Sequence, residues 1–176
     1  MRQRRRNLAI ARNLSELQQA ILNRTTLLGL EDACVSHLFL KVIYRALFND
    51  YIAHCIKVFE DRKQAASFWY IYRTNQKQID AFALRRKIDI KRLRIVSEKL
   101  KHIRNKTHFH IDKVGVLDTK GVWRDTRLPG KKLSRAVDSA WNILTDLQLS
   151  FNLPEVPLPE YRPSLVKRLA NLVDEQ

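Results

Sequence analysis

The sequence predicts an all-α fold, and three observations lead to this prediction. The chain has 176 residues, of which 45% are hydrophobic, enough to bury the core of one globular domain. Between Gly29 and Gly115 it contains neither glycine nor proline, the residues that mark turns and break helices. Apolar residues in that stretch recur mostly at intervals of three and four, as on the buried face of a helix. This stretch therefore reads as successive helices rather than as a sheet with tight hairpins.

The first half of the chain predicts a series of helices. Apolar residues at positions 14, 17, 21 and 22 predict an amphipathic first helix, and the segment from Asp32 to about Glu60, after Gly29, predicts a long core-facing helix. An aromatic run at 65–72 predicts a short helix, whose rings either pack in the core or stack on nucleobases. These rings belong to Phe68, Trp69, Tyr70 and Tyr72.

Another helix is expected to begin near Asp89. Its apolar residues repeat at spacings of three, four and three, which is the pattern of a helix that packs along its length on another helix. This set is the apolar seam of the predicted helix, and it consists of Leu93, Val96, Leu100 and Ile103.

The second half is divided by glycine and proline. Three glycines and a proline within 115–130 predict a loop or small hairpin insertion around 114–130, with the hairpin across Asp118 to Gly121. Helical spacing returns from Ser134 to Leu149. Four prolines then predict an extended strap over 152–163, before a short helix at 164–173. We expect residues 1–150 to form the helical domain and residues 151–176 to pack on it.

The chain is strongly basic, with 33 Lys and Arg, 18 Asp and Glu, a net charge of +15 and a pI near 10.2. Such charge favours polyanionic partners, meaning nucleic acid or an anionic membrane surface. The segment 85–113 holds eleven Lys or Arg against three acidic residues. Further arginines at positions 2, 4, 5 and 6 predict a mobile arm that strengthens polyanion binding.

The cysteines and the apolar runs predict the compartment. Cys34 and Cys55 lie in apolar helical sequence without metal-ligand spacing, so we expect both to be reduced core residues. The basic start lacks the apolar run of a signal peptide, and no apolar run is long enough to span a membrane. The sequence therefore predicts a cytoplasmic protein without membrane association.

A short motif closes the basic helix. Arg104 is followed by Asn105 and, five residues later, by His110, in the run Arg-Asn-Lys-Thr-His-Phe-His-Ile-Asp-Lys. This motif resembles the signature of the HEPN superfamily, and its tail of His110, Asp112 and Lys113 is most similar to the AbiU-type abortive-infection branch. The resemblance implies a helical bundle and a ribonuclease, acting as the toxin of a toxin–antitoxin or phage-defence system. It also implies a nucleotidyltransferase-type antitoxin partner.

Helix geometry indicates how the motif residues meet. If the helix continues past Ile103, Arg104 lies about 70° to one side of the apolar seam and His110 about 50° to the other. One chain then cannot easily bring both into one site. If the seam packs on a second copy, Arg104 of each chain approaches His110 of the other. The seam and the resemblance therefore both predict a homodimer.

The residue types fit RNA cleavage without a metal or other cofactor. RNA carries its own nucleophile, the 2′-hydroxyl, so cleavage needs a general acid/base, which His110 supplies, and a cation at the phosphate, which Arg104 supplies. We expect Asn105 to orient the histidine or substrate and His108 to be a second proton-transfer group. The residues expected to bind RNA are Lys99, Lys101, Lys106, Lys113, Arg92 and Arg94.

Two alternatives remain from the sequence. His108, His110 and Asp112 also match the opening of the metallo-β-lactamase pattern, but Lys113 stands where that pattern has a histidine, so we expect no metal site. The other alternative is a non-catalytic basic helical dimer that binds RNA, DNA or a partner protein.

Overall fold

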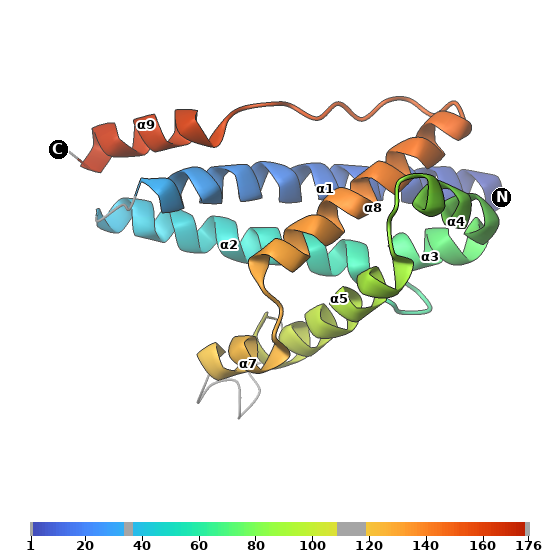
Figure 1. The fold of residues 1–176 in the computed structure, drawn as a ribbon, viewed down its shortest axis with the longest axis horizontal. Helices are drawn as coiled ribbons and strands as arrows, with labels where there is room; N and C mark the ends of the chain where they lie inside the picture. The colour runs from blue at the N-terminus through green and yellow to red at the C-terminus, as the bar shows by residue number, and fades with distance from the viewer. Residues whose placement is uncertain (1, 34–36, 109–118, 175–176) are drawn as a thin grey trace.

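The described chain is α-helical and has no strand (Figure 1). The structure is a computed structural model that describes residues 2–33, 37–108 and 119–174. In these ranges it contains eight α-helices and one turn of π-helix: α1 (Arg2–Asp32), α2 (Leu38–Phe59), α3 (Phe68–Thr74), α4 (Gln76–Arg85), α5 (Ile90–Ile103), η1 (Arg104–His108), α7 (Thr119–Thr126), α8 (Gly130–Ser150) and α9 (Pro163–Asp174). The predicted all-α class is confirmed.

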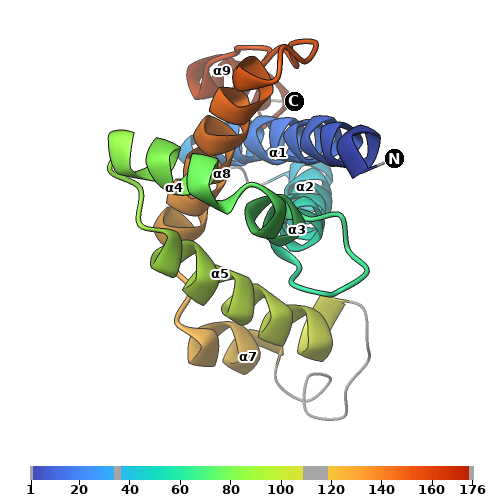
Figure 2. The same cartoon turned by 90° about the vertical axis from the view of Figure 1, so that its right-hand side faces the viewer.

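A long antiparallel pair, α1 and α2, organises the helices. Figure 1 shows α8 crossing α1 obliquely and α9 lying along α1, while α5 packs against α2 and α7 lies beyond α5 (Figure 2). The core lies between α1, α2, α3, α5 and α8, and its largest fully buried side chains include Trp69, Phe59 and Phe68. The core interpretation of the aromatic run is therefore confirmed for Phe68 and Trp69, whereas Tyr70 and Tyr72 are half-buried.

The helix predicted near Asp89 is confirmed as α5. The Asp89 side chain accepts a hydrogen bond from the backbone N–H of Lys91 at 2.9 Å, which satisfies one of the free donors at the helix start. The apolar seam lies on α5 and is called the α5 seam from here on. It is buried within the chain itself, with at most 6% of any of its four residues exposed. Its interpretation as the surface that meets a second copy is therefore wrong, because the same spacing serves a helix packed in its own core. The homodimer itself stays a prediction.

The sequence suggested that Gly29 separates two helices, and this prediction is wrong. It lies inside α1, which continues to Asp32, and α2 begins only at Leu38. A Cβ atom at Gly29 would lie 2.5 Å from Cβ of Val166 and 2.6 Å from the carbonyl oxygen of Pro163. Gly29 therefore lets the first turn of α9 approach the backbone of α1, so its role is close packing rather than a turn.

Gly29→Ala is expected to displace α9 from α1, since Pro163 contributes a backbone atom that cannot rotate away. The clash outweighs the gain in helix propensity of about 1 kcal/mol. Limited proteolysis should then cut the segment 151–174 faster than in the unmodified protein. Gly130→Ala is the matched control, because no atom lies within 4 Å of a Cβ there. Unchanged proteolysis together with a higher melting temperature for Gly29→Ala would contradict the close-packing role.

The prediction of a loop or hairpin insertion around 114–130 is wrong for the part of this segment that the structure describes. Residues Thr119–Thr126 form α7, while residues 114–118 lie outside the described residues. Val122 is buried, and the Trp123 ring lies 5.5 Å from that of Phe48 on α2. These long-range contacts hold a helix in a segment whose Gly121 suggested a turn.

The N-terminal arginines form the start of α1 rather than a mobile arm. Arg4 and Arg5 are exposed, and the guanidinium of Arg6 lies 3.7 Å over the ring of Phe151, after α8. The predicted strap is confirmed: residues 151–162 contain no helix, and the Tyr161 hydroxyl donates to the carbonyl oxygen of Leu22 on α1 at 2.6 Å. The helix predicted after it is α9.

Asp146 on α8 anchors the end of α4. Its carboxylate accepts two hydrogen bonds from Arg86, both at 2.7 Å, and one from Arg85 at 2.8 Å, and its side chain is 6% exposed. The hydrogen bonds from Arg86 hold the pKa of Asp146 below its usual value; burial opposes this shift, and Arg85 adds to it. This contact fixes the turn that leads into α5.

Asp146→Asn should lower the free energy of unfolding at pH 7 by about 1–2 kcal/mol, because it leaves two guanidinium groups without their carboxylate. A carboxyl whose folded pKa is depressed stabilises the fold above its unfolded pKa of about 3.9, and this contribution disappears as the pH falls through the folded pKa. The difference between the two proteins should therefore shrink below about pH 4. Urea unfolding at pH 7 and pH 3 measures it, and an equal difference at both values would contradict the ion pair's role.

Candidate functional site

The predicted motif lies where α5 changes into a π-helix. Residues Arg104–His108 form η1, so the assumption of a continuous α-helix past Ile103 is wrong. Short π-helical turns occur frequently at functional sites because they redirect side chains. Asn105 is exposed and Lys106 half-buried, while only the backbone of His108 is described. His110 and Lys113 lie outside the described residues.

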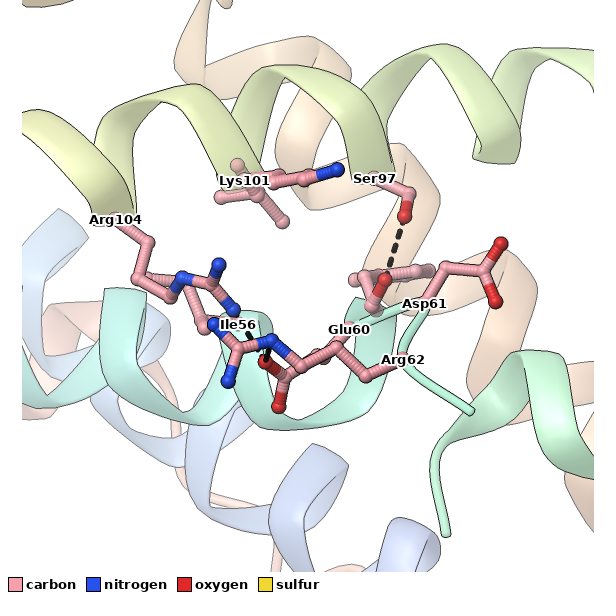
Figure 3. A pocket seen from close by; sticks show the side chains of 9 residues that line it. Ile56, Glu60, Asp61, Arg62, Ser97, Lys101 and Arg104 are labelled. Carbon is pink, nitrogen blue, oxygen red and sulfur yellow. Dashed lines mark hydrogen bonds and ion pairs between the residues drawn. The ribbon is translucent and has the colours of Figure 1, made fainter. Parts of the chain in front are cut away.

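Arg104 is the buried member of the motif, with 7% of its surface exposed. Its Nε and one terminal nitrogen donate to Oδ1 of Asn105 at 3.0 and 2.7 Å. The other terminal nitrogen donates to Glu60, and Figure 3 shows this bond. These bonds fix the plane of the guanidinium. Asn105, expected to orient the histidine or substrate, instead holds Arg104 in this structure.

Glu60 is the residue that sequence reasoning missed. It caps the C-terminal end of α2 and lies 44 positions before Arg104, and Oε1 of its carboxylate also pairs with Nε of Arg62 at 2.9 Å. One carboxylate is thus shared by two guanidinium groups. No local pattern marks Glu60 as the partner of Arg104, because helix packing brings them together.

The space beside Arg104 is a small pocket of about 20 Å³, room for roughly one water molecule. Figure 3 shows its wall, in which Ser97 and Lys101 come from α5 and Arg104 from the start of η1. The end of α2 contributes Glu60 and the residues after it. A nucleotide does not fit inside it. A phosphate group therefore cannot enter this pocket and can approach Arg104 from its mouth.

A buried hydrogen-bonded network of Ser97, Trp69 and the backbone of Phe59 holds the pocket wall in place. The Ser97 hydroxyl donates to the carbonyl oxygen of Phe59 at 2.5 Å, and the indole N–H of Trp69 donates to the same carbonyl at 3.1 Å and to the Ser97 oxygen at 3.0 Å. Three elements are thereby tied at one point, namely the end of α2, α3 and α5. The network fixes the backbone directly before Glu60.

A second ion-pair cluster lies beside the pocket at Asp61. Arg73 pairs with its carboxylate at 2.6 Å and Arg94 pairs with it as well, while the Arg94 guanidinium lies 3.7 Å over the Trp69 ring. Burial raises the pKa of Asp61, but the hydrogen bonds from Arg73 and Arg94 outweigh it and lower the pKa overall. The charge of Arg94, expected to contact RNA, is thus already matched in part.

The other expected RNA-binding residues divide between two faces of α5. Lys101 lines the pocket beside Arg104, whereas Arg92 and Lys99 line a separate groove between α5 and α8. Two cations of that groove, Lys132 and Arg135, were not singled out from the sequence. They stand three residues apart on α8, which begins at Gly130, whereas the helix predicted from the sequence begins only at Ser134 and so excludes Lys132. The spacing of three residues is a usable signal for one basic face.

His37, His54 and Cys55 have ordinary structural roles, while Cys34 lies outside the described residues. His37 is exposed and caps α2 by accepting from the N–H of Phe39 at 3.3 Å, and His54 bonds Glu16 at 2.6 Å and Asp50 at 3.2 Å. The described residues hold no cluster of metal-ligating side chains. Cys55 is fully buried, and burial raises the pKa of its thiol to about 12.

Comparisons with known proteins add no relative. No family model, curated protein or solved structure matches the chain. Within the described ranges, every helix is too short or too polar to traverse a lipid bilayer.

Proposed function

We propose that the chain is a metal-independent endoribonuclease of HEPN type, with Arg104 as its phosphate-binding cation and His110 as its general acid/base. The observation that supports this best is the fixed, buried guanidinium of Arg104 at the end of the most basic helix. The resemblance of the motif supplies the family, and with it the role of toxin, held in check by a nucleotidyltransferase-type antitoxin.

The geometry of Arg104 suits an anion that develops charge during the reaction. A guanidinium has five N–H donors, and its bonds to Asn105 and Glu60 use three of them. Two donors remain for phosphate oxygens. Because the group is already oriented and largely shielded from water, it stabilises the transition state without reorganising.

The reaction follows from these groups. His110 takes the proton of the 2′-hydroxyl, the 2′-oxygen forms a bond to phosphorus, and the bond from phosphorus to the 5′-oxygen breaks. His108 returns a proton to the leaving 5′-oxygen. The products are a 2′,3′-cyclic phosphate and a 5′-hydroxyl, and Arg104 stabilises the extra negative charge of the pentacoordinate phosphorus between them.

The resemblance of the motif still implies a homodimer, and we propose that Arg104 of one copy and His110 of the other meet at one site. Mixing two inactive variants, Arg104→Ala and His110→Ala, tests the arrangement. A mixed dimer then contains one site with both native residues, so activity should return after subunit exchange. Mixtures that stay inactive despite demonstrated exchange would overturn the shared site.

The main experiment is cleavage of a single-stranded RNA in EDTA, with products analysed for cyclic phosphate ends. Activity in EDTA that is lost in Arg104→Ala and in His110→Ala supports the proposal. Arg12→Ala is the matched control, because Arg12 is an exposed arginine on α1 that pairs with a carboxylate, Glu16, and lines neither the pocket nor the groove. Activity that survives either substitution overturns the assignment of these residues.

A second candidate is a non-catalytic RNA-binding protein, and one observation favours it. The charge of Arg104 is already neutralised by Glu60, as expected for a structural ion pair. In that case RNA stays intact in every assay, while its affinity for the chain falls steeply with salt.

A further inference from the structure

A large groove lies between α5 and α8, away from Arg104. Its volume is about 1040 Å³, at the upper end of the roughly 300–1,000 Å³ typical of ligand sites. One wall comes from the α4–α5 turn and the first part of α5, and the other from Leu128 and the first half of α8. Every residue that lines it belongs to the described part of the chain.

Six cations line this groove against two carboxylates. The cations are Arg86, Lys87, Arg92, Lys99, Lys132 and Arg135, and the carboxylates are Asp89 and Asp138. The groove therefore has a net positive charge, as expected of a site that binds an anion. The ion pairs of these residues show which of the cations lack a carboxylate partner.

Both carboxylates of the groove already have arginine partners. Asp89 pairs with Arg92 at 3.4 Å, and Asp138 pairs with Arg24 of α1 at 2.8 Å. Arg86 is matched by Asp146 outside the groove. The other four cations make no ion pair with any described residue: Lys87, Lys99, Lys132 and Arg135.

The groove combines these cations with an apolar floor. Leu93, Val96, Leu128 and Ala136 are buried beneath it, while Ile95 lines it with 53% of its surface exposed. A concave site with cations and an exposed apolar side chain fits a polymer that has a charged backbone and flat apolar bases. A lipid surface instead requires a convex or flat basic face.

This groove and the Arg104 pocket share no residue. The α5 residues of the groove are centred on Arg92, Val96 and Lys99, and those of the pocket are Ser97, Leu100 and Lys101. At 100° per residue the two sets point roughly a third of a turn apart around the helix axis. The groove is thus a separate site and not the mouth of the pocket.

We propose that the α5–α8 groove binds the phosphate backbone of single-stranded RNA and holds the substrate outside the cleavage site. This inference rests on the proposed function, which makes RNA the substrate. A single strand enters a groove between two packed helices, whereas double-stranded RNA is contacted across its wide minor groove by an extended surface.

Binding of a fluorescent 2′-O-methyl oligonucleotide tests the groove without cleavage, since that probe lacks the nucleophile. The variant Lys132→Gln/Arg135→Gln should bind the probe at least about tenfold more weakly at 0.1 M salt. The negative slope of log affinity against log salt should become less steep by about 1.4. Both residues are exposed and without ion pairs, so the fold should be unaffected. The matched control is Lys167→Gln/Arg168→Gln, an exposed Lys and Arg on α9 with the same change of charge.

The outcomes separate this inference from the proposed function. If the wild type fails to cleave RNA but the groove variant binds the probe more weakly than the control, the groove is supported and the ribonuclease is not. If the wild type cleaves RNA while both variants bind the probe equally, the ribonuclease stands and the groove is overturned. Equal affinity for a duplex probe, or groove-dependent binding to anionic lipid vesicles in place of the probe, also overturns it.

Discussion

Arg104→Ala is expected to lower the rate of RNA cleavage by a factor of about 100 or more, without a comparable loss of RNA affinity. Removing one preorganised donor from a developing oxyanion costs about 10²–10³ in rate, and this substitution removes both free donors of Arg104. Steady-state and single-turnover cleavage, measured with a fluorescent RNA in EDTA, separates the rate of the chemical step from binding.

Arg104→Lys distinguishes charge from geometry in the same assay. Lysine keeps the positive charge but lacks the planar fork that Asn105 and Glu60 hold in place. We therefore expect it to recover only a small part of the lost rate. Circular dichroism at the assay temperature checks that each variant is folded. Recovery of near-native cleavage by Arg104→Lys would show that a diffuse charge suffices, against the role of a positioned fork.

Glu60→Gln is expected to lower the free energy of unfolding by about 2–4 kcal/mol. Arg104 is buried, so removing the carboxylate leaves its charge without a partner in a poorly solvated place. The double variant Glu60→Gln/Arg104→Met should recover much of this loss, because it removes the stranded charge as well. Urea unfolding of both single variants and the double variant measures the coupling between the two residues.

The control for this cycle is Glu98→Gln, which neutralises an exposed carboxylate on the neighbouring helix α5. Its effect should lie within about 0.5 kcal/mol. If Glu60→Gln is equally mild, the ion pair with Arg104 contributes little, and water at the pocket solvates the cation instead. Additive single effects in the double variant would lead to the same conclusion.

The helices with strong local signals were predictable. The cap at Asp89 and the spacing of the α5 seam depend on residues a few positions apart, and the structure has the helix they predict. Gly29 and α7 were not, because their conformation is decided by distant partners. Gly29 lies against Val166 and Pro163, and Trp123 against Phe48. The residues next to a glycine in the sequence do not show whether it forms a turn or allows a close helix contact, because glycine suits both.

The candidate site was predictable only as single residues. The sequence singles out Arg104 through its motif, yet Glu60 belongs to another helix and carries no mark of its own. The partner of the α5 seam was misjudged for a related reason, since the spacing specifies that a helix packs but not on which chain. The sequence alone did not show how the cations of segment 85–113 are arranged in space. In the structure, Lys101 and Arg104 line the pocket, whereas Arg92 and Lys99 line the groove.

The two sites lie roughly a third of a turn apart around α5, and this separation sets a minimum length for an efficient substrate. A dinucleotide can reach the Arg104 pocket or the α5–α8 groove but cannot reach both, so it gains nothing from the second. A longer strand that passes around α5 is tethered at one site while it reacts at the other, which raises the local concentration of its scissile phosphate. The catalytic efficiency should therefore rise in a step, rather than gradually, once the oligonucleotide is long enough to reach from the α5–α8 groove to the Arg104 pocket.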